Sequence, residues 1–379
     1  MVKRIVFLMS DTGGGHRAAA EAIQEALHLQ YGPNAVTVSL VDVYRQMKYP
    51  MNKMPEFYPW IVNHAPWAWG LGYFIGNIKP ICWLSQRLMY LNNRKRLQQM
   101  VKDHPADVVV SVHSVITQPS MMAYRAVFSL DDMPPFLIVV TDLVSTPRYW
   151  YDSRADHCYV PTQAAYDNGI RNGMSPNQMT ITGLPVHPRF MDVQASKTEL
   201  RQAFGWDVNL PTVLMVAGGD GMGPLYETAR AIDAIDTPCQ LVVIAGKNDN
   251  LKQRLQQTDW RHPVHVYGFV QDMPQKMKAV DILVTKAGPA TITEAGIMGL
   301  PMILSDSIPG QEAGNVTHVE VNNAGVFIRN NPALVAKTLQ NWLSDDGQTL
   351  KQLQQNACKL SNPNAVWEIA DAIWQYANR

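Results

Sequence analysis

Three glycines and a histidine follow directly on an apolar run near the N-terminus. The segment SDTGGGHRAAAEAI, residues 10–23, begins where the run 5–9 ends. Glycine loses more backbone entropy on ordering than other residues, so a compact fold keeps three of them only where the chain turns sharply or a ligand approaches the backbone. A helix that begins near His16 would direct free N–H groups and its positive end at an anion. The stretch predicts a ligand-binding loop, and a tight turn needed only for helix packing is the alternative.

The histidine of this loop could accept a proton. A helix N-terminus disfavours the imidazolium, so we expect His16 to be neutral near pH 7 and available as a general base. A capping or surface histidine would be an equally ordinary role. His113, in SVHS, and Asp142, in VVTDL, also follow predicted strands. Both are further candidates for the base.

The second half of the chain contains three more loops of this kind. VAGGDGMGP, residues 216–224, follows a short apolar run and contains Gly218 and Gly219. TKAGPATITEAGIMGLP, residues 285–301, leads through a Gly-Pro turn into a predicted helix. Glu294 lies about one turn into that helix, where its carboxylate could accept two hydrogen bonds from the vicinal hydroxyls of a ribose or simply complement the helix dipole. SIPGQEAGN, residues 307–315, brings together amide and carboxylate side chains, namely Gln311, Glu312 and Asn315. Such side chains could bind the hydroxyls of a sugar, and a solvated loop is the alternative.

The elements that must position these loops alternate between short apolar runs and longer helical patterns. We expect strands at 5–9, 36–41, 108–112, 136–140, 213–216, 241–245, 264–267, 282–284 and 302–304. This alternation is typical of parallel sheets covered on both faces, and it occurs twice. TGLPVHPRF, residues 182–190, separates the two sets. The sequence therefore predicts an α/β protein with two Rossmann-like doubly wound domains, whose strand-end loops would face a common cleft.

Composition limits the function classes. A chain of 379 residues is longer than a single hydrophobic core usually supports, so two domains are expected. The formal net charge is zero, which gives no support for nucleic-acid binding. Four cysteines lie far apart and form no CxxC pair, so no zinc site is predicted and a reducing cytoplasm is expected. No stretch approaches the roughly 20 apolar residues of a membrane-spanning helix.

One segment departs from this neutral average. Residues 57–102 contain no Asp or Glu but six basic and nine aromatic side chains, among them Trp67, Trp69 and Phe74. Aromatic and basic side chains together are typical of a surface that lies in an anionic bilayer interface. Three prolines exclude one long helix, so we expect an interfacial loop. The alternative is that the aromatic side chains fill the N-terminal core.

These motifs resemble those of the monogalactosyldiacylglycerol synthase family and its bacterial diacylglycerol glucosyltransferase relatives. The resemblance rests on residues 10–23, 285–315 and 321–327, and extends to SVHS, VVTDL and GLPVHPRF, so it covers nearly the whole chain. It implies the GT-B fold, with an N-terminal domain 1–187, a C-terminal donor domain 188–360, and a C-terminal helix within 361–379 that returns to the N-terminal domain. After TDL the chain reads VSTPRYWYDS where plant members have a histidine-containing loop, so its acceptor or sugar preference could differ.

The resemblance also assigns roles. It implies that His16 is the general base, that Gly14 and Gly15 lie beneath the donor phosphates, and that Glu294 binds the ribose. It further implies that Gln311 and Glu312 contact the donor sugar. Other donor-binding positions are expected in the glycine-rich loops and in the segment that would bind uracil: Gly218, Gly219, Phe269, Val270, Gly288, Pro289, Ala290, Thr291 and Asn315. The acceptor and membrane side is expected at Trp67, Trp69, Phe74, His113 and Asp142.

The expected function is inverting transfer of glucose or galactose from a UDP-sugar to diacylglycerol at an anionic membrane surface. We expect no cofactor beyond the donor and no metal site, since no Asp-x-Asp motif occurs. The expected location is cytoplasmic, peripheral on the inner face of the cell membrane. Three alternatives stay open: a UDP-sugar 2-epimerase of the same fold, an N-acetylglucosaminyltransferase that acts on a lipid-linked cell-wall precursor, and a catalytically silent nucleotide-sugar-binding protein.

Overall fold

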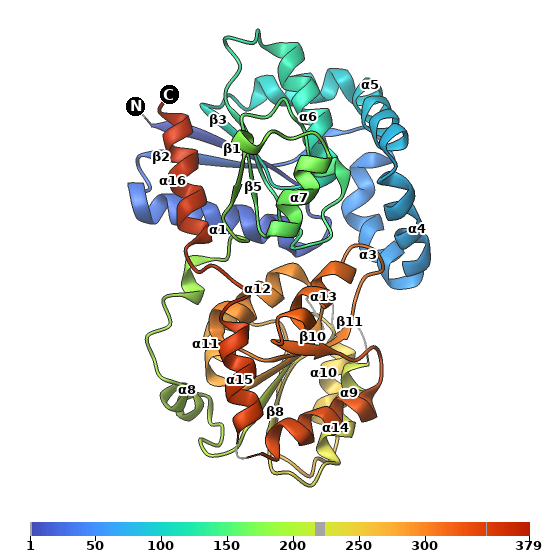
Figure 1. Cartoon of the computed structure of the whole chain (residues 1–379), viewed down its shortest axis with the longest axis vertical. Coiled ribbons are helices and arrows are strands. Elements are labelled where there is room, and N and C mark those ends of the chain that lie inside the picture. The colour runs from blue at the N-terminus through green and yellow to red at the C-terminus, as the bar shows by residue number, and fades with distance from the viewer. Residues whose placement is uncertain (1, 217–223, 346) are drawn as a thin grey trace. The chain divides into compact units, whose positions relative to one another are not determined.

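The chain folds into two compact units, each built on one parallel sheet. The computed structural model describes residues 2–216, 224–345 and 347–379 (Figure 1). The first unit consists of residues 1–188, 308–314 and 362–379, and the second of residues 189–307 and 315–361. The predicted fold class, with two doubly wound domains, is confirmed by the two six-stranded sheets.

The sheet of the first unit has the strand order β2-β1-β3-β4-β5-β6, and all neighbours are parallel. Its strands are β1 (Lys3–Met9), β2 (Val36–Asp42), β3 (Val108–Ser111), β4 (Phe136–Val139), β5 (His157–Val160) and β6 (Met179–Ile181). The last two are not among the expected strands. β1, β3 and β4 are almost fully buried because helices cover both faces of the sheet, which explains their continuous apolar sequences.

Helices of the first unit follow the strand ends and cover the sheet. They are α1 (Gly14–Tyr31), α2 (Val43–Gln46), α3 (Met54–His64), α4 (Pro66–Gly76), α5 (Lys79–Asp103), α6 (Ser114–Val127), α7 (Gln163–Arg171) and α16 (Ala365–Ala377). Gly13, the residue before α1, has a φ of 76°, a left-handed conformation that favours glycine. The turn expected at the glycine triplet therefore exists, and α1 starts two residues earlier than predicted.

The acid-free segment is helical, which corrects the expectation of an interfacial loop. α3, α4 and α5 divide residues 54–103 between them. Pro66 is the first residue of α4 and Pro80 lies in the first turn of α5. Backbone N–H groups in the first turn of a helix make no hydrogen bond within the helix, so a proline, which has no N–H, is tolerated there. These prolines therefore begin new helices, and they prevent only a single long one.

The second unit repeats the architecture with the strand order β12-β11-β10-β7-β8-β9. Its strands are β7 (Thr212–Val216), β8 (Gln240–Ile244), β9 (Val264–Tyr267), β10 (Ile282–Lys286), β11 (Met302–Asp306) and β12 (Gly325–Phe327). Its helices are α8 (Lys197–Phe204), α9 (Leu225–Asp233), α10 (Asp249–Gln256), α11 (Met273–Ala279), α12 (Pro289–Met298), α13 (Ala313–Val321), α14 (Pro332–Leu343) and α15 (Gln348–Ala357). The strand β12 is not among the expected strands.

Two segments from the second half of the sequence pack within the first unit. The C-terminal helix α16 lies beside α1 (Figure 1), where the Trp374 ring stacks on Tyr31 at 4.4 Å between centroids. Residues 308–314, predicted to lie in the C-terminal domain, also pack with the first unit. Pro309 approaches Gly70 of α4 so closely that a Cβ there would lie 3.1 Å from the proline Cβ, and the Ser145 hydroxyl accepts a hydrogen bond from the Gly314 N–H. The location of Gln311 and Glu312 is a consequence of these contacts.

Candidate active site

The ring of His16 is held at the end of the sheet by one of its two nitrogens. Nδ1 lies 2.9 Å from the Val112 carbonyl oxygen and 2.8 Å from the Thr141 hydroxyl oxygen. A carbonyl can only accept, so Nδ1 carries the hydrogen and Nε2 has a free lone pair. Burial lowers the pKa of His16 to about 4, although the bond to Val112 opposes the shift. The imidazole is therefore neutral near pH 7, and desolvation is the main cause.

The two other candidate bases surround this ring. The His113 ring lies 4.3 Å from the His16 ring, and its Nε2 is 2.8 Å from the Thr12 hydroxyl. Burial and the neighbouring His16 lower the pKa of His113 well below its usual value. Burial raises the pKa of Asp142 to about 6, while hydrogen bonds from the indole of Trp150 and from Gln311 oppose that change. His16 and His113 are thus neutral near pH 7, whereas Asp142 is still mostly ionised at that pH.

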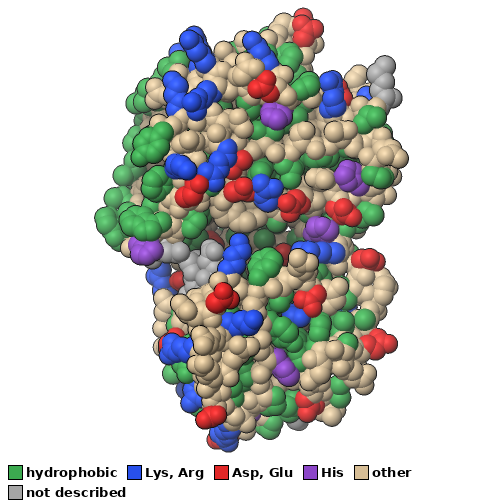
Figure 2. Space-filling view, turned by 180° about the vertical axis from the view of Figure 1, so that it is seen from behind, with side chains coloured by type: hydrophobic (Ala, Val, Ile, Leu, Met, Phe, Trp, Pro, Cys, Tyr) green, Lys and Arg blue, Asp and Glu red, His purple; other side chains and the backbone are tan. Residues whose placement is uncertain are grey.

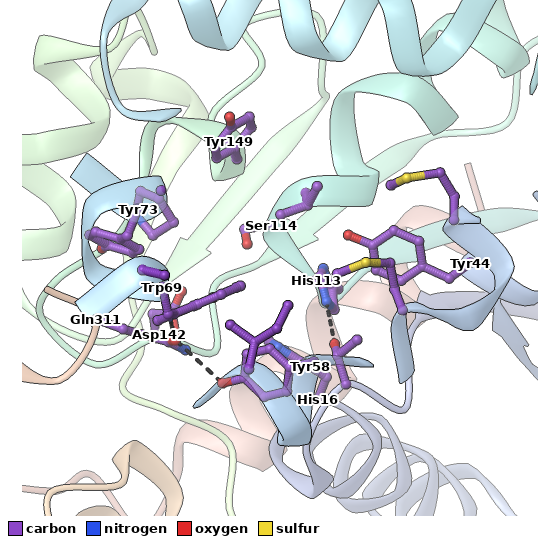
Figure 3. Close-up of a pocket in the computed structure, with 18 of the residues that line it drawn as sticks. His16, Tyr44, Tyr58, Trp69, Tyr73, His113, Ser114, Asp142, Tyr149 and Gln311 are labelled. Atoms are coloured by element: carbon purple, nitrogen blue, oxygen red, sulfur yellow. Dashed lines mark hydrogen bonds between the residues drawn. The ribbon is translucent and has the colours of Figure 1, made fainter. Parts of the chain in front are cut away.

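These side chains line one pocket of about 570 Å³ in the first unit (Figure 3). Its polar side chains are few: Thr12, His16, His113, Ser114, Asp142 and Gln311. Most of the remaining lining is apolar or aromatic: Tyr44, Met51, Met54, Tyr58, Trp60, Ile61, Ala65, Ala68, Trp69, Gly72, Tyr73, Met89, Val115, Pro147 and Tyr149. A large apolar pocket with a few converging polar groups is typical of a small-molecule site.

Gln311 reaches the pocket because α3 and α4 hold its amide. Its Oε1 accepts hydrogen bonds from the Tyr58 hydroxyl at 3.4 Å and from the Trp69 indole at 3.2 Å. The Glu312 carboxylate is buried and accepts a hydrogen bond from the backbone N–H of Ile308 at 2.8 Å, so it closes the 308–312 turn. The proposed sugar contacts of both residues stay predictions.

The predicted membrane residues separate into two groups. Trp67 and Phe74 are 72% and 70% exposed on α4, whereas Trp69 on the same helix is half-buried and lines the pocket. The expectation that Trp69 belongs to an inserting surface is therefore corrected, because its ring packs edge-on against Tyr58. Ten other apolar side chains on α3–α5, or at residue 78 just before α5, are also exposed, and Figure 2 shows hydrophobic side chains gathered along one edge of the first unit: Phe57, Trp60, Leu71, Ile75, Ile78, Ile81, Trp83, Leu84, Leu88 and Leu91. We call these twelve side chains the apolar patch.

In the second unit, the loop after β10 leads into the N-terminus of α12. Gly288 precedes the helix, and Pro289, Ala290 and Thr291 form its first turn. Proline has no N–H, so the donors of this turn without an intrahelical partner are the N–H groups of Ala290 and Thr291. Glu294 is half-buried on α12, and burial raises its pKa to about 7 while the charge of Arg189 opposes the shift. An N–H cradle and a carboxylate one turn apart suit a phosphate and a hydroxyl-bearing group, respectively.

The remaining donor-binding candidates differ in their surroundings. Asn315 is buried, and its amide donates to the Ala287 carbonyl at 2.9 Å, so it supports the loop after β10. Phe269, beyond the end of β9, is 65% exposed with the Lys247 ammonium 5.9 Å from its ring centroid, and Val270 is half-buried. In the first unit, a Cβ on Gly14 or Gly15 would meet no neighbouring atom, so the backbone there is uncovered. Gly218 and Gly219 lie outside the described residues.

Sequence reasoning missed the residues that hold the candidate base and acid. Thr141 stands beside Asp142 in the VVTDL motif, and its hydroxyl bonds to both His16 and the Val112 carbonyl. Trp150 is fully buried in the VSTPRYWYDS segment and donates to Asp142 at 2.7 Å. The motif contained Thr141, but nothing in the sequence distinguishes a supporting threonine from a strand-end residue. Among the described residues, no cluster of His, Cys, Asp or Glu suited to a metal ion is found.

Comparison with known proteins agrees with this architecture. The model of the monogalactosyldiacylglycerol (MGDG) synthase family matches residues 16–186, and that of the glycosyltransferase family 28 C-terminal domain matches residues 212–372. The chain is 37% identical to monogalactosyldiacylglycerol synthase 3, chloroplastic, of Arabidopsis thaliana over 98% of this chain and 81% of the relative. It is 38% identical to the Spinacia oleracea monogalactosyldiacylglycerol synthase, chloroplastic, over 97% of this chain and 71% of the relative. The chain belongs to the MGDG synthase family.

Solved structures place this MGDG synthase family member in the GT-B fold. MurG of Acinetobacter baumannii superposes with a TM-score of 0.64 at 14% identity and covers 98% of this chain and 99% of its own. The UDP co-structure of S. aureus MnaA gives a TM-score of 0.65 at 14% identity, with 100% and 97% covered. At this identity the likeness shows the fold alone. The family membership makes the protein a glycosyltransferase, so the epimerase, cell-wall and silent-binding alternatives are not favoured.

The predicted location is wrong. We expected a cytoplasmic protein on the inner face of the cell membrane, but the MGDG synthases of Arabidopsis, soybean and spinach that match nearly the whole chain are named as chloroplastic. Composition and cysteine spacing report only a reducing environment, which does not distinguish compartments. Within the described residues, the helices are too short or too polar to cross a membrane.

Proposed function

We propose that the protein transfers a hexosyl group from a UDP-sugar to the free hydroxyl of diacylglycerol, with inversion at the anomeric carbon. One observation carries the proposal: His16, whose Nδ1 holds the hydrogen and whose Nε2 is unprotonated, lines a largely apolar pocket. In the proposed step, the acceptor oxygen forms a bond to the anomeric carbon and the bond from that carbon to the diphosphate breaks. The acceptor proton goes to His16 Nε2, and UDP leaves with the electron pair. A single displacement of this kind inverts the configuration.

The donor is proposed to bind the second unit. The free N–H groups at the start of α12 would bind the diphosphate, Glu294 the ribose, and the segment at Phe269 and Val270 the uracil. We propose that helix N-termini stabilise the leaving diphosphate without a metal ion. Activity should then persist after treatment with EDTA, and a loss that Mn²⁺ restores would contradict this part.

The lipid is proposed to reach the first unit from a membrane. Part of the apolar patch lies on α5, and the same helix carries six exposed basic side chains, namely Lys79, Arg87, Arg94, Lys95, Arg96 and Lys102. Such a surface suits an interface with anionic headgroups. The names of the relatives favour galactose as the sugar and diacylglycerol as the acceptor.

The test is transfer of isotopic label from UDP-galactose, UDP-glucose or UDP-N-acetylglucosamine to diacylglycerol in mixed micelles. We expect labelled glycolipid with a β-linkage, formed fastest from UDP-galactose. His16→Ala should lower turnover by about 10²-fold or more and keep UDP binding, because general base catalysis typically contributes that much. Leu130→Ala, at an exposed position outside the pocket, is the control. No labelled lipid from any donor, or normal turnover of His16→Ala, would contradict the proposal.

A further inference from the structure

The pocket beside His16 is larger than the acceptor hydroxyl and glycerol require. Its polar side chains gather around His16, His113 and Asp142 (Figure 3), whereas the rest of its lining extends to α3 and α5. A volume of about 570 Å³ lies within the range of about 300–1000 Å³ that is typical of sites for drug-sized ligands. The apolar part of the pocket therefore has room for a substantial apolar group.

Three methionines converge on this apolar part from separate elements. Met51 precedes α3, Met54 begins it, and Met89 lies on α5. All three are partly buried and pack against the core of the first unit, which includes Tyr44. Methionine is unbranched and has three rotatable bonds, so it adapts to a flexible apolar chain more readily than a branched side chain does. The lining thus suits a ligand without a fixed shape.

Two helices, α3 and α4, contribute side chains both to the pocket and to the apolar patch. On α4, Trp69 and Gly72 line the pocket while Trp67 and Phe74 are exposed. On α3, Trp60 belongs to both surfaces, since it lines the pocket and is 58% exposed. The apolar surface is therefore continuous from the patch to the neighbourhood of His16.

We propose that this pocket, lined by Met51, Met54 and Met89, binds one acyl chain of the diacylglycerol acceptor while the glycerol hydroxyl lies at His16 Nε2. The inference rests on the proposed function and adds an acyl-chain site to it. The second chain stays at the apolar patch, because the two helices α3 and α4 carry apolar side chains on both their pocket and their exposed faces. The site then selects acceptors by the length of one chain.

Short-chain diacylglycerols test this site without a membrane. The measured quantity is the ratio of kcat/KM for dioctanoylglycerol to that for dibutanoylglycerol, with both acceptors below the concentration at which they aggregate. Each methylene that enters the pocket should raise kcat/KM by up to about 4-fold, since burying a methylene contributes about 0.8 kcal/mol. For the wild type we expect a ratio of at least about 10.

Met89→Trp should lower this ratio at least about 10-fold, because the indole fills the space for the chain. Asn92→Trp places the same side chain at an exposed position of α5 and should keep the wild-type ratio. If Met89→Trp melts early, Met54→Trp tests the same space from α3. If the wild type and a folded tryptophan variant of Met89 or Met54 gave the same kcat/KM ratio, the acyl-chain site would be overturned, but the proposed function would stand. Failure of the wild type to glycosylate any diacylglycerol would overturn the proposed function itself.

Discussion

At the scale of single residues, the tautomer of His16 is fixed by a neighbouring carbonyl group, which can only accept a hydrogen bond. The Val112 carbonyl holds the hydrogen on Nδ1, and the Thr141 hydroxyl, which itself donates to Val112, supplies a second acceptor. Burial keeps the pKa of the ring at about 4, so the population with a free Nε2 is close to complete at neutral pH. Thr141 is therefore a positioning residue.

Replacing Thr141 should change turnover and not donor binding. Thr141→Val keeps the shape and removes the hydroxyl, so we expect kcat to fall about 5-fold, which corresponds to the loss of one hydrogen bond of about 1 kcal/mol. Thr141→Ser should recover most of the rate, and UDP affinity measured by calorimetry should be the same in all three proteins. Equal kcat values for the Val and Ser variants would show that Thr141 does not orient His16.

The ionisation of Glu294 should make UDP binding depend on pH. Burial raises its pKa to about 7, and an ionised carboxylate accepts hydrogen bonds from hydroxyls more strongly than a protonated one. As the pH falls through about 7 the carboxylate is protonated, so UDP should bind more weakly at pH 6 than at pH 8. Glu294→Gln should bind more weakly than the wild type at pH 8 and lose most of this pH dependence. Calorimetric titrations of both proteins separate the effect from the titration of UDP itself, and identical slopes would contradict the role.

At the scale of elements, the two faces of α4 have different roles. Its exposed face carries Trp67 and Phe74, and its inner face packs Gly70 and Tyr73 against residues 309 and 310. A Cβ at Gly310, whose φ is 79°, would lie 2.9 Å from the Tyr73 ring, so this approach depends on glycine. The exposed face is therefore free for a membrane while the inner face supports Gln311.

The double variant Trp67→Ser, Phe74→Ser tests the membrane role of α4. It should bind vesicles that contain anionic lipid more weakly than the wild type, by about 10-fold, and keep the wild-type melting temperature because neither side chain is buried. Raising the salt concentration should weaken wild-type binding, since exposed charges are screened beyond about 10 Å at 0.1 M ionic strength. Leu130→Ser, at an exposed position outside α3–α5, is the control. A large loss of stability with undiminished vesicle binding would show that these side chains belong to the core.

Local sequence pattern was enough to predict most of the strands and the loops at their ends. The apolar runs at strands such as β1 and β7 are continuous because both sheet faces are covered, and the glycine loops stand at the strand ends where parallel sheets place ligands. β12 was missed because three residues, Gly325–Phe327, are too few for a periodic signal. The pairing of Gln311 with Trp69 was not predictable either, because 242 residues separate them and only the tertiary fold brings them together.

At the scale of the whole molecule, the last helix of the chain completes the first unit. α16 buries Val366, Ile369 and Ile373, and it stacks Trp374 on Tyr31, whose hydroxyl also donates to the Asp371 carboxylate. The adjoining Asn362 amide donates to the Thr182 carbonyl at 2.8 Å. The first unit therefore lacks part of its core when residues 362–379 are absent.

Deleting residues 362–379 should destabilise the first unit much more than the second. Full burial of each of three aliphatic side chains contributes about 1.5–3 kcal/mol, so their loss removes several kcal/mol from a domain whose total stability is about 5–15 kcal/mol. Calorimetric melting should show an early transition in the truncated protein, while UDP affinity survives because the second unit keeps residues 189–307 and 315–361. Tyr31→Phe removes only the hydroxyl and should cost about 1 kcal/mol, which makes it the matched control. An unchanged melting profile after truncation would mean that α16 contributes little to the core that it covers.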